Sequence, residues 1–226
     1  MNVITKITTV ALAASFLFPA YAEKNNESDK LDFTSERTAE KSLLFDREKG
    51  EEIQVLYFFS YGCPYCFKNE NIVKVYQKYA ANKPISFHYV PIEVSMYMKE
   101  YAKAYYMADS LKVDIHDHLF KNIHVNKKYI YNEDTLVNYF VENFDTDYFL
   151  TKNAYKSSFI KLKIMKNELL ADKYHITSTP TLVIVPKNGD SYKLSPTING
   201  NLLNMMTDSV KISEYILNNE GNNGTK

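Results

Sequence analysis

The run Ile53–Phe59 restricts the possible folds of this chain more than any other feature. It is apolar almost throughout and combines β-branched with aromatic residues, which is typical of a strand buried on both faces of a sheet. A helix with an apolar stripe is predicted from Pro64 to about Ala80, and a second strand is predicted over Pro84–Pro91. A strand, a helix and a strand in this order indicate a right-handed βαβ unit with parallel strands.

Residues 95–173 have a different pattern. Apolar residues recur there at helical spacing, and the stretch contains neither proline nor glycine. We therefore expect a block of several helices, with breaks near residues 109–114, 132–134 and 143–147. The polar residues at the second break suit the start of a helix.

The later part of the chain, residues 174–218, contains a predicted hairpin and a predicted helix. The runs Thr181–Val185 and Ser191–Leu194 flank an Asn-Gly pair, which favours a tight turn. The helix is expected to extend from about Leu202 to Asn218. The polar residues 219–226 that follow are expected to be disordered.

The N-terminal region has the pattern of an export signal. Lys6 is followed by an apolar run that ends at Phe18 and then by Ala20-Tyr21-Ala22, the small-x-small pattern of a cleavage site. The run is too short to span a bilayer core, which takes about 20 residues. We expect cleavage of residues 1–22 after Ala22, leaving a freely diffusing periplasmic protein that is not itself a membrane protein. Residues 23–52 form a polar segment whose first part is expected to be a loose tail.

The charge of the chain is balanced, with 27 basic and 27 acidic residues. It therefore lacks the basic footprint of a nucleic-acid-binding protein, and no nucleic-acid partner is expected. Export to an oxidising compartment makes the chain's two cysteines, Cys63 and Cys66, prone to disulfide chemistry.

Only Pro64 and Tyr65 separate the two cysteines, and two structural interpretations of the pair are weak. A disulfide that closes a four-residue loop contributes only about 2 kcal/mol, against about 4.7 kcal/mol for a hundred-residue loop. A structural zinc site needs four ligands, and the pair supplies half of them. The only close histidine pair, His116 and His118, is far along the chain and is expected to be solvated on a helix surface.

A redox interpretation explains the neighbouring residues as well. Gly62 after the apolar strand and Pro64 at a favoured first helical position place Cys63 at the N-cap of the helix. The unpaired backbone N–H groups and the helix dipole there favour the thiolate of Cys63. Because Cys66 follows one turn later on the same face, Cys63 is the predicted exposed nucleophile and Cys66 the shielded resolving cysteine.

A low pKa at Cys63 would make the disulfide a good oxidant. A thiol with a pKa of about 8.5 is roughly 3% thiolate at pH 7, whereas a thiol with a pKa of about 5 is almost wholly thiolate. That difference favours the reduced form by about 2.7 kcal/mol at pH 7. The disulfide is then about 60 mV more oxidising.

Two motifs resemble those of the thioredoxin superfamily: Cys-Pro-Tyr-Cys after a buried strand, and Thr179-Pro180 at the start of a later strand. The inserted helical block and the stretch from Gln54 to Pro64 are similar to the DsbA family of periplasmic thiol:disulfide oxidoreductases. The resemblance covers roughly residues 53–218 and implies an α/β thioredoxin fold with a central mixed sheet and an inserted helical domain. The expected divisions are residues 53–94 for the first half of the fold, 95–173 for the helical domain, and 174–218 for the second half.

The resemblance also implies roles for individual residues. A cis peptide bond is expected before Pro180, with the backbone of Thr179 pairing with an extended substrate beside the disulfide. Pro64 and Tyr65 are expected to tune the redox properties of the pair. Strongly oxidising members of the family have histidine at the position of Tyr65, and many have a buried acid at the position of Tyr57 and valine at that of Thr179.

The function implied by the resemblance is donation of the Cys63–Cys66 disulfide to reduced exported polypeptides. A DsbB-like, quinone-linked membrane oxidase would reoxidise the pair, and no cofactor is expected. The alternative is a periplasmic isomerase or reductase, although residues 23–52 are too few for the dimerisation domain that isomerases usually carry. A third interpretation is a two-coordinate Cu(I) site. Because Tyr65 and Phe67 are poor ligands, no metal is expected.

Overall fold

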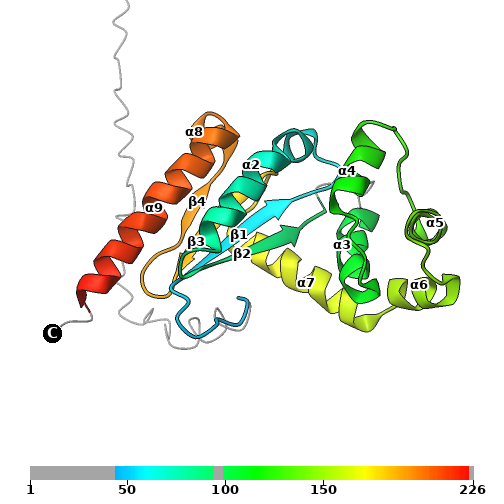
Figure 1. Cartoon of the computed structure of the whole chain (residues 1–226), viewed down its shortest axis with the longest axis horizontal. Coiled ribbons are helices and arrows are strands. Elements are labelled where there is room, and N and C mark those ends of the chain that lie inside the picture. Colours follow the sequence, from blue (N-terminus) through cyan, green and yellow to red (C-terminus); the bar gives the residue numbers. More distant parts are fainter. Residues whose placement is uncertain (1–43, 94–98, 224–226) are drawn as a thin grey trace, which may run out of the picture. The chain divides into compact units, whose positions relative to one another are not determined.

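The computed structural model describes residues 44–93 and 99–223 of the protein (Figure 1). The predicted leader and the first part of the polar segment 23–52 lie outside these ranges. Within them, the strands are β1 (Ile53–Phe59), β2 (Ile85–Pro91), β3 (Thr181–Pro186) and β4 (Tyr192–Leu194). The helices are α2 (Pro64–Ala80), α3 (Lys99–Leu111), α4 (His116–His124), α5 (Glu133–Phe144), α6 (Tyr148–Tyr155), α7 (Ser158–Lys173), α8 (Pro196–Asn199) and α9 (Leu202–Asn223). None of these helices combines the length and the apolar character that crossing a bilayer requires.

The strands form one mixed sheet in the order β2-β1-β3-β4. β1 and β2 are parallel, with Ile53 opposite Ile85 and Phe59 opposite Pro91, as the predicted βαβ unit requires. β3 is antiparallel to both β1 and β4. The predicted mixed sheet and the order of its elements are confirmed.

Strand β1 is apolar throughout because both of its faces are covered. Every residue of β1 is buried. Ile53, Val55, Tyr57 and Phe59 belong to the larger core cluster, which also contains residues of α2 and α9. Leu56 and Phe58 alternate with them and belong to a second cluster around Leu170 of α7 and residues of β3. Figure 1 shows α2 and α9 side by side on one face of the sheet.

The helical block between β2 and β3 consists of α3 to α7 among the described residues. The breaks at residues 112–115 and 145–147 overlap the predicted ones, whereas the longest break, residues 125–132, begins earlier than predicted. The predicted helix start is confirmed there, because Asn132 caps α5 by accepting a hydrogen bond from the backbone N–H of Thr135. The short break between α6 and α7, at Lys156 and Ser157, was not predicted. The block shares the larger core cluster through residues such as Phe120 of α4.

The predicted hairpin is present, but its turn is not the tight one that Asn-Gly favours. The last paired residues are Ile184 and Tyr192, so the connection is a longer loop. Gly189 has a positive φ of 88°, whereas Asn188 does not, although a two-residue type I′ turn requires both. Pro186 explains the difference, because it has no backbone N–H with which to extend the pairing with β4.

The predicted disorder from Asn219 onward is wrong for residues 219–223, because α9 continues to Asn223. The side-chain amide of Asn219 donates to the backbone oxygen of Tyr215, 3.0 Å away, one helical turn earlier. Polar residues are compatible with an exposed helical turn of this kind. Residues 224–226 lie outside the described ranges.

The end of the polar segment is packed against the sheet. Leu44 and Phe45 contact the second core cluster. Arg47 donates to the backbone oxygens of Val185 and Pro186 at 2.9 and 3.0 Å. Residues 44–52 are therefore part of the folded unit.

Candidate active site

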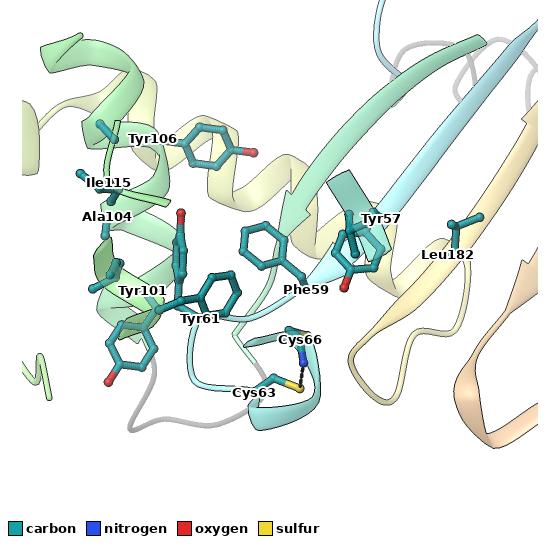
Figure 2. Packing of buried hydrophobic residues seen from close by; sticks show 14 of the residues in the cluster. Tyr57, Phe59, Tyr61, Cys63, Cys66, Tyr101, Ala104, Tyr106, Ile115 and Leu182 are labelled. Carbon is teal, nitrogen blue, oxygen red and sulfur yellow. Dashed lines mark hydrogen bonds between the residues drawn. The ribbon is translucent and has the colours of Figure 1, made fainter. Parts of the chain in front are cut away.

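The two cysteines lie where β1 ends and α2 begins. Cys63 is the N-cap residue of α2, with extended backbone angles (φ −84°, ψ 115°), and Pro64 occupies the first helical position. The sulfur of Cys63 accepts a hydrogen bond from the backbone N–H of Cys66 at 3.4 Å (Figure 2). The predicted N-cap is therefore present, and the positive end of the helix dipole faces the Cys63 sulfur.

The accessibility of the two sulfurs differs less than expected. Cys63 was expected to be exposed, and this is wrong, because the residue is only 8% exposed. Cys66 is fully buried at 0%, which leaves Cys63 as the sulfur that solvent can reach. Figure 2 shows the rings of Tyr57, Phe59 and Tyr61 gathered on one side of the cysteine turn.

A second loop covers Cys63 from the other half of the fold. The Thr179–Pro180 peptide bond is cis. The Cys63 thiol donates to the backbone oxygen of Thr179 at 3.3 Å. The two loops meet because Phe58, near the end of β1, is paired with Thr181 at the start of β3. The structure thus brings Thr179 and Pro180 next to the cysteine pair.

The environment moves the two thiol pKa values in opposite directions. A hydrogen bond from the Cys66 thiol is the main cause that lowers the pKa of Cys63 to about 6. The Thr179 side chain and the backbone N–H groups of Cys66 and Tyr65 lower it further, against the opposing effect of burial. Burial, followed by the hydrogen bond to Cys63 and its charge, raises the pKa of Cys66 well above that of a free thiol.

The two residues between the cysteines contribute mainly through the backbone. Pro64 begins the helix. Tyr65 is 67% exposed, and its backbone N–H, rather than its hydroxyl, helps to lower the pKa of Cys63.

A buried carboxyl group near the pair was not expected from the sequence. Glu70 lies one turn after Cys66 on the buried face of α2 and is 6% exposed. The hydroxyl of Tyr89 on β2 donates to its Oε1 at 2.6 Å. The available signal was the spacing of four from Cys66, which puts a charged residue on an otherwise buried helix face.

Tyr57, on β1, is close enough to both Glu70 and the cysteines for their charges to raise its pKa. Its hydroxyl is buried and has no hydrogen-bond partner among the described residues. Burial raises the pKa of Tyr57 well above that of free tyrosine, and the charges of Cys66, Glu70, Tyr89 and Cys63 add to the effect. Tyr57 is therefore a neutral phenol that interacts with both Cys66 and Glu70.

The two histidines of α4 differ from the expectation of solvated surface groups. That expectation fits His118, which is exposed although its ring bonds the Tyr139 hydroxyl at 2.8 Å. It is wrong for His116, which lies in the aromatic core between Tyr61 and Glu70. Within residues 44–93 and 99–223, no cluster of three or more His, Cys, Asp or Glu side chains is placed to hold a metal ion.

Comparison with known proteins shows the family of the chain. The family model described as a thioredoxin-like domain matches residues 46–197. The thiol:disulfide interchange protein DsbA of Bordetella parapertussis is 27% identical over 151 residues, covering 66% of this chain and 69% of the relative. The protein of the same name from Pseudomonas aeruginosa is 26% identical over 184 residues, covering 79% and 82%.

Solved structures show the same fold. The crystal structure of Pseudomonas aeruginosa DsbA aligns with a TM-score of 0.63 at 24% identity, covering 78% of this chain and 88% of that one. DsbA from Xylella fastidiosa aligns with a TM-score of 0.63 at 20% identity, covering 75% and 87%. Fold and cysteine pair together define the class of the protein: it is a thioredoxin-fold thiol:disulfide oxidoreductase with an inserted helical domain. Within that class, the chain belongs to the DsbA family.

Proposed function

We propose that the protein donates the Cys63–Cys66 disulfide to reduced polypeptides that have been exported to the periplasm. The observation that carries this proposal is the difference between the two sulfurs. The Cys63 pKa is lowered to about 6, whereas the Cys66 pKa is raised by burial. A stabilised Cys63 thiolate favours the reduced enzyme and therefore favours transfer of the disulfide to the substrate.

The proposed reaction begins when a substrate thiolate attacks the sulfur of Cys63. The Cys63–Cys66 bond breaks, Cys66 leaves as a thiolate, and a mixed disulfide joins Cys63 to the substrate. A second substrate thiolate then attacks the substrate sulfur of that bond, and Cys63 leaves as a thiolate. In balance, two substrate thiols lose two electrons and two protons; the enzyme gains the electrons and one proton, and the second proton goes to solvent.

The departing Cys66 thiolate needs a proton, because burial disfavours its charge. Tyr57 and Glu70 are the proposed route, because the Tyr57 hydroxyl has no hydrogen-bond partner among the described residues and the charges of both Cys66 and Glu70 act on it. In the reverse direction, the same groups take the proton when Cys66 attacks a mixed disulfide at Cys63.

Thr179 and Pro180 are proposed to seat the substrate. Pro180 has no N–H to occupy the space beside the disulfide, and the Thr179 backbone lies next to Cys63. An extended substrate segment can pair with this backbone in the manner of an added strand. The pairing places a substrate sulfur opposite the accessible sulfur of Cys63.

The compartment and the redox partner follow from the same proposal. Removal of residues 1–22 after Ala22 would release the protein into the periplasm. A DsbB-like, quinone-linked membrane oxidase would then restore the disulfide. A periplasmic reductase or isomerase is the second candidate, and Tyr65 favours it, because strongly oxidising relatives have histidine at that position. Thr179 also differs from those relatives, but here its side chain lowers the Cys63 pKa.

The test is the equilibrium of the purified mature protein with reduced and oxidised glutathione, without added metal. We expect the Cys63–Cys66 disulfide to be more oxidising than glutathione and to oxidise a peptide that carries two thiols. Cys63→Ser is the control and should be inactive in peptide oxidation. A disulfide more reducing than the glutathione couple would replace the donor function with the reductase function. Dependence of turnover on copper would instead support a metal site.

A further inference from the structure

Glu70 has an unusual set of neighbours for a buried carboxyl group. An ionised carboxylate away from water needs charged or hydrogen-bonding partners, because desolvation costs several kcal/mol. The hydroxyl of Tyr89 is one partner of Glu70 Oε1. The other is His116, whose Nε2 lies 3.0 Å from the same oxygen. His116 is carried by α4, so this partner comes from the inserted helical block.

His116 is held on both sides of its ring. Its Nδ1 lies 2.9 Å from the hydroxyl of Tyr61, which directly precedes the cysteine turn. Its ring packs against Phe59, Tyr89 and Phe120, with ring centres 4.9 to 5.6 Å apart. These contacts fix the orientation of the imidazole toward Glu70. Among the described residues the Nε2 atom has no aligned hydrogen-bond partner, and Glu70 Oε1 is the polar atom that it approaches, at 3.0 Å.

The other ionisable groups around Glu70 do not replace His116. Lys74, the next residue on that face of α2, pairs with Asp117 of α4. The tyrosines that face the site come from β1, the following loop, β2 and α3, and burial raises the pKa of each, so all remain neutral phenols: Tyr57, Tyr61, Tyr89 and Tyr105. Among the described groups that face Glu70, His116 is therefore the one whose ring nitrogen lies against its carboxyl group.

The second carboxyl oxygen of Glu70, Oε2, is not engaged by Tyr89 or His116. Oε2 of Glu70 and the hydroxyl of Tyr57 are both buried and both lack a hydrogen-bond partner among the described residues. Buried polar atoms without partners are uncommon in folded proteins and call for an explanation. Transfer of a proton between Glu70 and Cys66 by way of these two atoms would explain why both lack partners.

We propose that His116 is a positioning residue of the redox centre, which holds the Glu70 carboxylate in place and lets it exchange a proton with Cys66 through Tyr57. The inserted helical block thereby takes part in the chemistry of the cysteine pair. This inference rests on the proposed function, but it concerns the rate of one step and not the direction in which the disulfide is transferred.

The step can be observed with oxidised glutathione and the reduced mature protein. The Cys63 thiolate attacks the glutathione disulfide, one glutathione thiolate leaves and is protonated, and Cys63 carries the other glutathione. Cys66 then loses its proton and attacks Cys63, which releases the second glutathione. Acid quenching followed by mass measurement gives the formation rate and the decay rate of the Cys63–glutathione adduct.

For His116→Phe, we expect adduct formation at the wild-type rate and adduct decay slowed on the order of 10-fold at pH 7, since a positioned base is worth at least that much. The decay rate should recover in alkaline solution, where hydroxide removes the Cys66 proton. His124→Phe is the matched control. His124 also lies on α4 and contacts the same loop, at the backbone oxygen of Tyr61, 2.8 Å away, but does not contact Glu70. Its decay rate should stay within about twofold of wild type.

A double-mutant cycle separates positioning from general loosening of the fold. In the Glu70→Gln background the base is already lost, so adding His116→Phe should slow decay no further. His116→Gln, which keeps a polar side chain, is the second variant if His116→Phe folds poorly, and it should also slow decay because one amide does not reproduce the contacts of both ring nitrogens. Equal slowing by His116→Phe and His124→Phe, or equal slowing by His116→Phe with and without Glu70, would overturn the proposal. A reducing potential would contradict the donor function and leave this test intact.

Discussion

Cys63 and Cys66 are one helical turn apart, yet they lie in regions of different construction. The rim of the site consists of Cys63, Tyr65, Thr179 and Pro180, where the sulfur is surrounded by backbone N–H groups and the cis-proline loop. The floor consists of the buried residues Cys66, Tyr57 and Glu70 together with the half-buried Tyr89 and His116. The pKa of Cys63 is lowered, mainly by the hydrogen bond from the Cys66 thiol below it, whereas burial raises the pKa of Cys66, which gives the two sulfurs separate tasks.

Serine substitutions should separate those tasks most clearly, and their effects should be the largest. Cys63→Ser removes the accessible sulfur and should abolish all exchange. Cys66→Ser should still form mixed disulfides but should release them slowly, so that substrate adducts accumulate and can be seen by mass. If Cys63→Ser formed adducts through Cys66 as fast as Cys66→Ser forms them through Cys63, the assignment of Cys63 as the attacked sulfur would be contradicted.

Tyr57→Phe tests the floor by removing one oxygen atom. The lost hydroxyl is buried without a partner among the described residues, so we expect the free energy of unfolding to rise by about 1 kcal/mol. Decay of the Cys63–glutathione adduct should slow on the order of 10-fold, because the proton route is broken.

Tyr106→Phe is the control for that substitution, since the Tyr106 hydroxyl donates to Asn167 at 2.9 Å. This variant should lose about 1 kcal/mol of stability and keep the wild-type decay rate. A Tyr57→Phe protein that resolved its adduct as fast as the Tyr106→Phe protein would remove Tyr57 from the route.

The pH dependence of the free energy of unfolding of the reduced protein tests the lowered pKa of Cys63. Because the Cys63 pKa of about 6 lies below that of a free thiol, the unfolded reduced chain binds more protons than the folded one between about pH 6 and 8.5. The folded reduced form is therefore favoured by about 1.4 kcal/mol at pH 7, or about 30 mV in potential. That advantage should increase above pH 7 and disappear as the pH falls through about 6.

Denaturant unfolding of the reduced and oxidised forms at pH 5 and pH 7 measures this difference. The free energy of unfolding of the reduced form should increase relative to that of the oxidised form as the pH rises. If the difference between these two free energies of unfolding did not change with pH, Cys63 would titrate as an ordinary thiol.

Thr179→Val should have the smallest effect. A hydrogen bond from the Thr179 side chain is one of several causes that lower the Cys63 pKa, so its loss raises the pKa. A neutral hydrogen bond worth about 0.7 kcal/mol changes the equilibrium about threefold, which would reduce the thiolate fraction at pH 6 from about one half to about one quarter. Thr181→Val is the matched control, because Thr181 bonds the Ser178 backbone oxygen instead. An unchanged thiolate fraction in Thr179→Val would leave the lowering to the Cys66 thiol and the backbone N–H groups at the helix N-terminus.

The rim could be predicted from the sequence because its causes are local. A buried strand, Pro64 at the first helical position and two cysteines one turn apart define the N-cap site without knowledge of the rest of the fold. The nearness of Thr179 came from the family resemblance. What the sequence did not show is how deeply the cis-proline loop covers Cys63, because that depends on the pairing of β1 with β3.

The floor could not be predicted because its members come from four separate elements. Glu70 could have been noticed by its spacing from Cys66. No pattern in the sequence connects His116 with Glu70, since their contact depends on how α4 packs against α2. The turn between β3 and β4 was predicted wrongly for a similar reason. The Asn-Gly pair favours a tight turn locally, but the pairing of β3 with β4 ends before Pro186, which lacks the N–H needed to continue it.

The most direct test of this account is titration of the two thiols in the reduced mature protein, followed by thiolate absorbance and by alkylation at each pH. The account predicts that Cys63 titrates at a pKa of about 6 and that Cys66 stays protonated and unlabelled well above the pKa of a free thiol. A Cys63 thiol that titrated near pH 8.5, or a Cys66 thiol that was alkylated first, would contradict it.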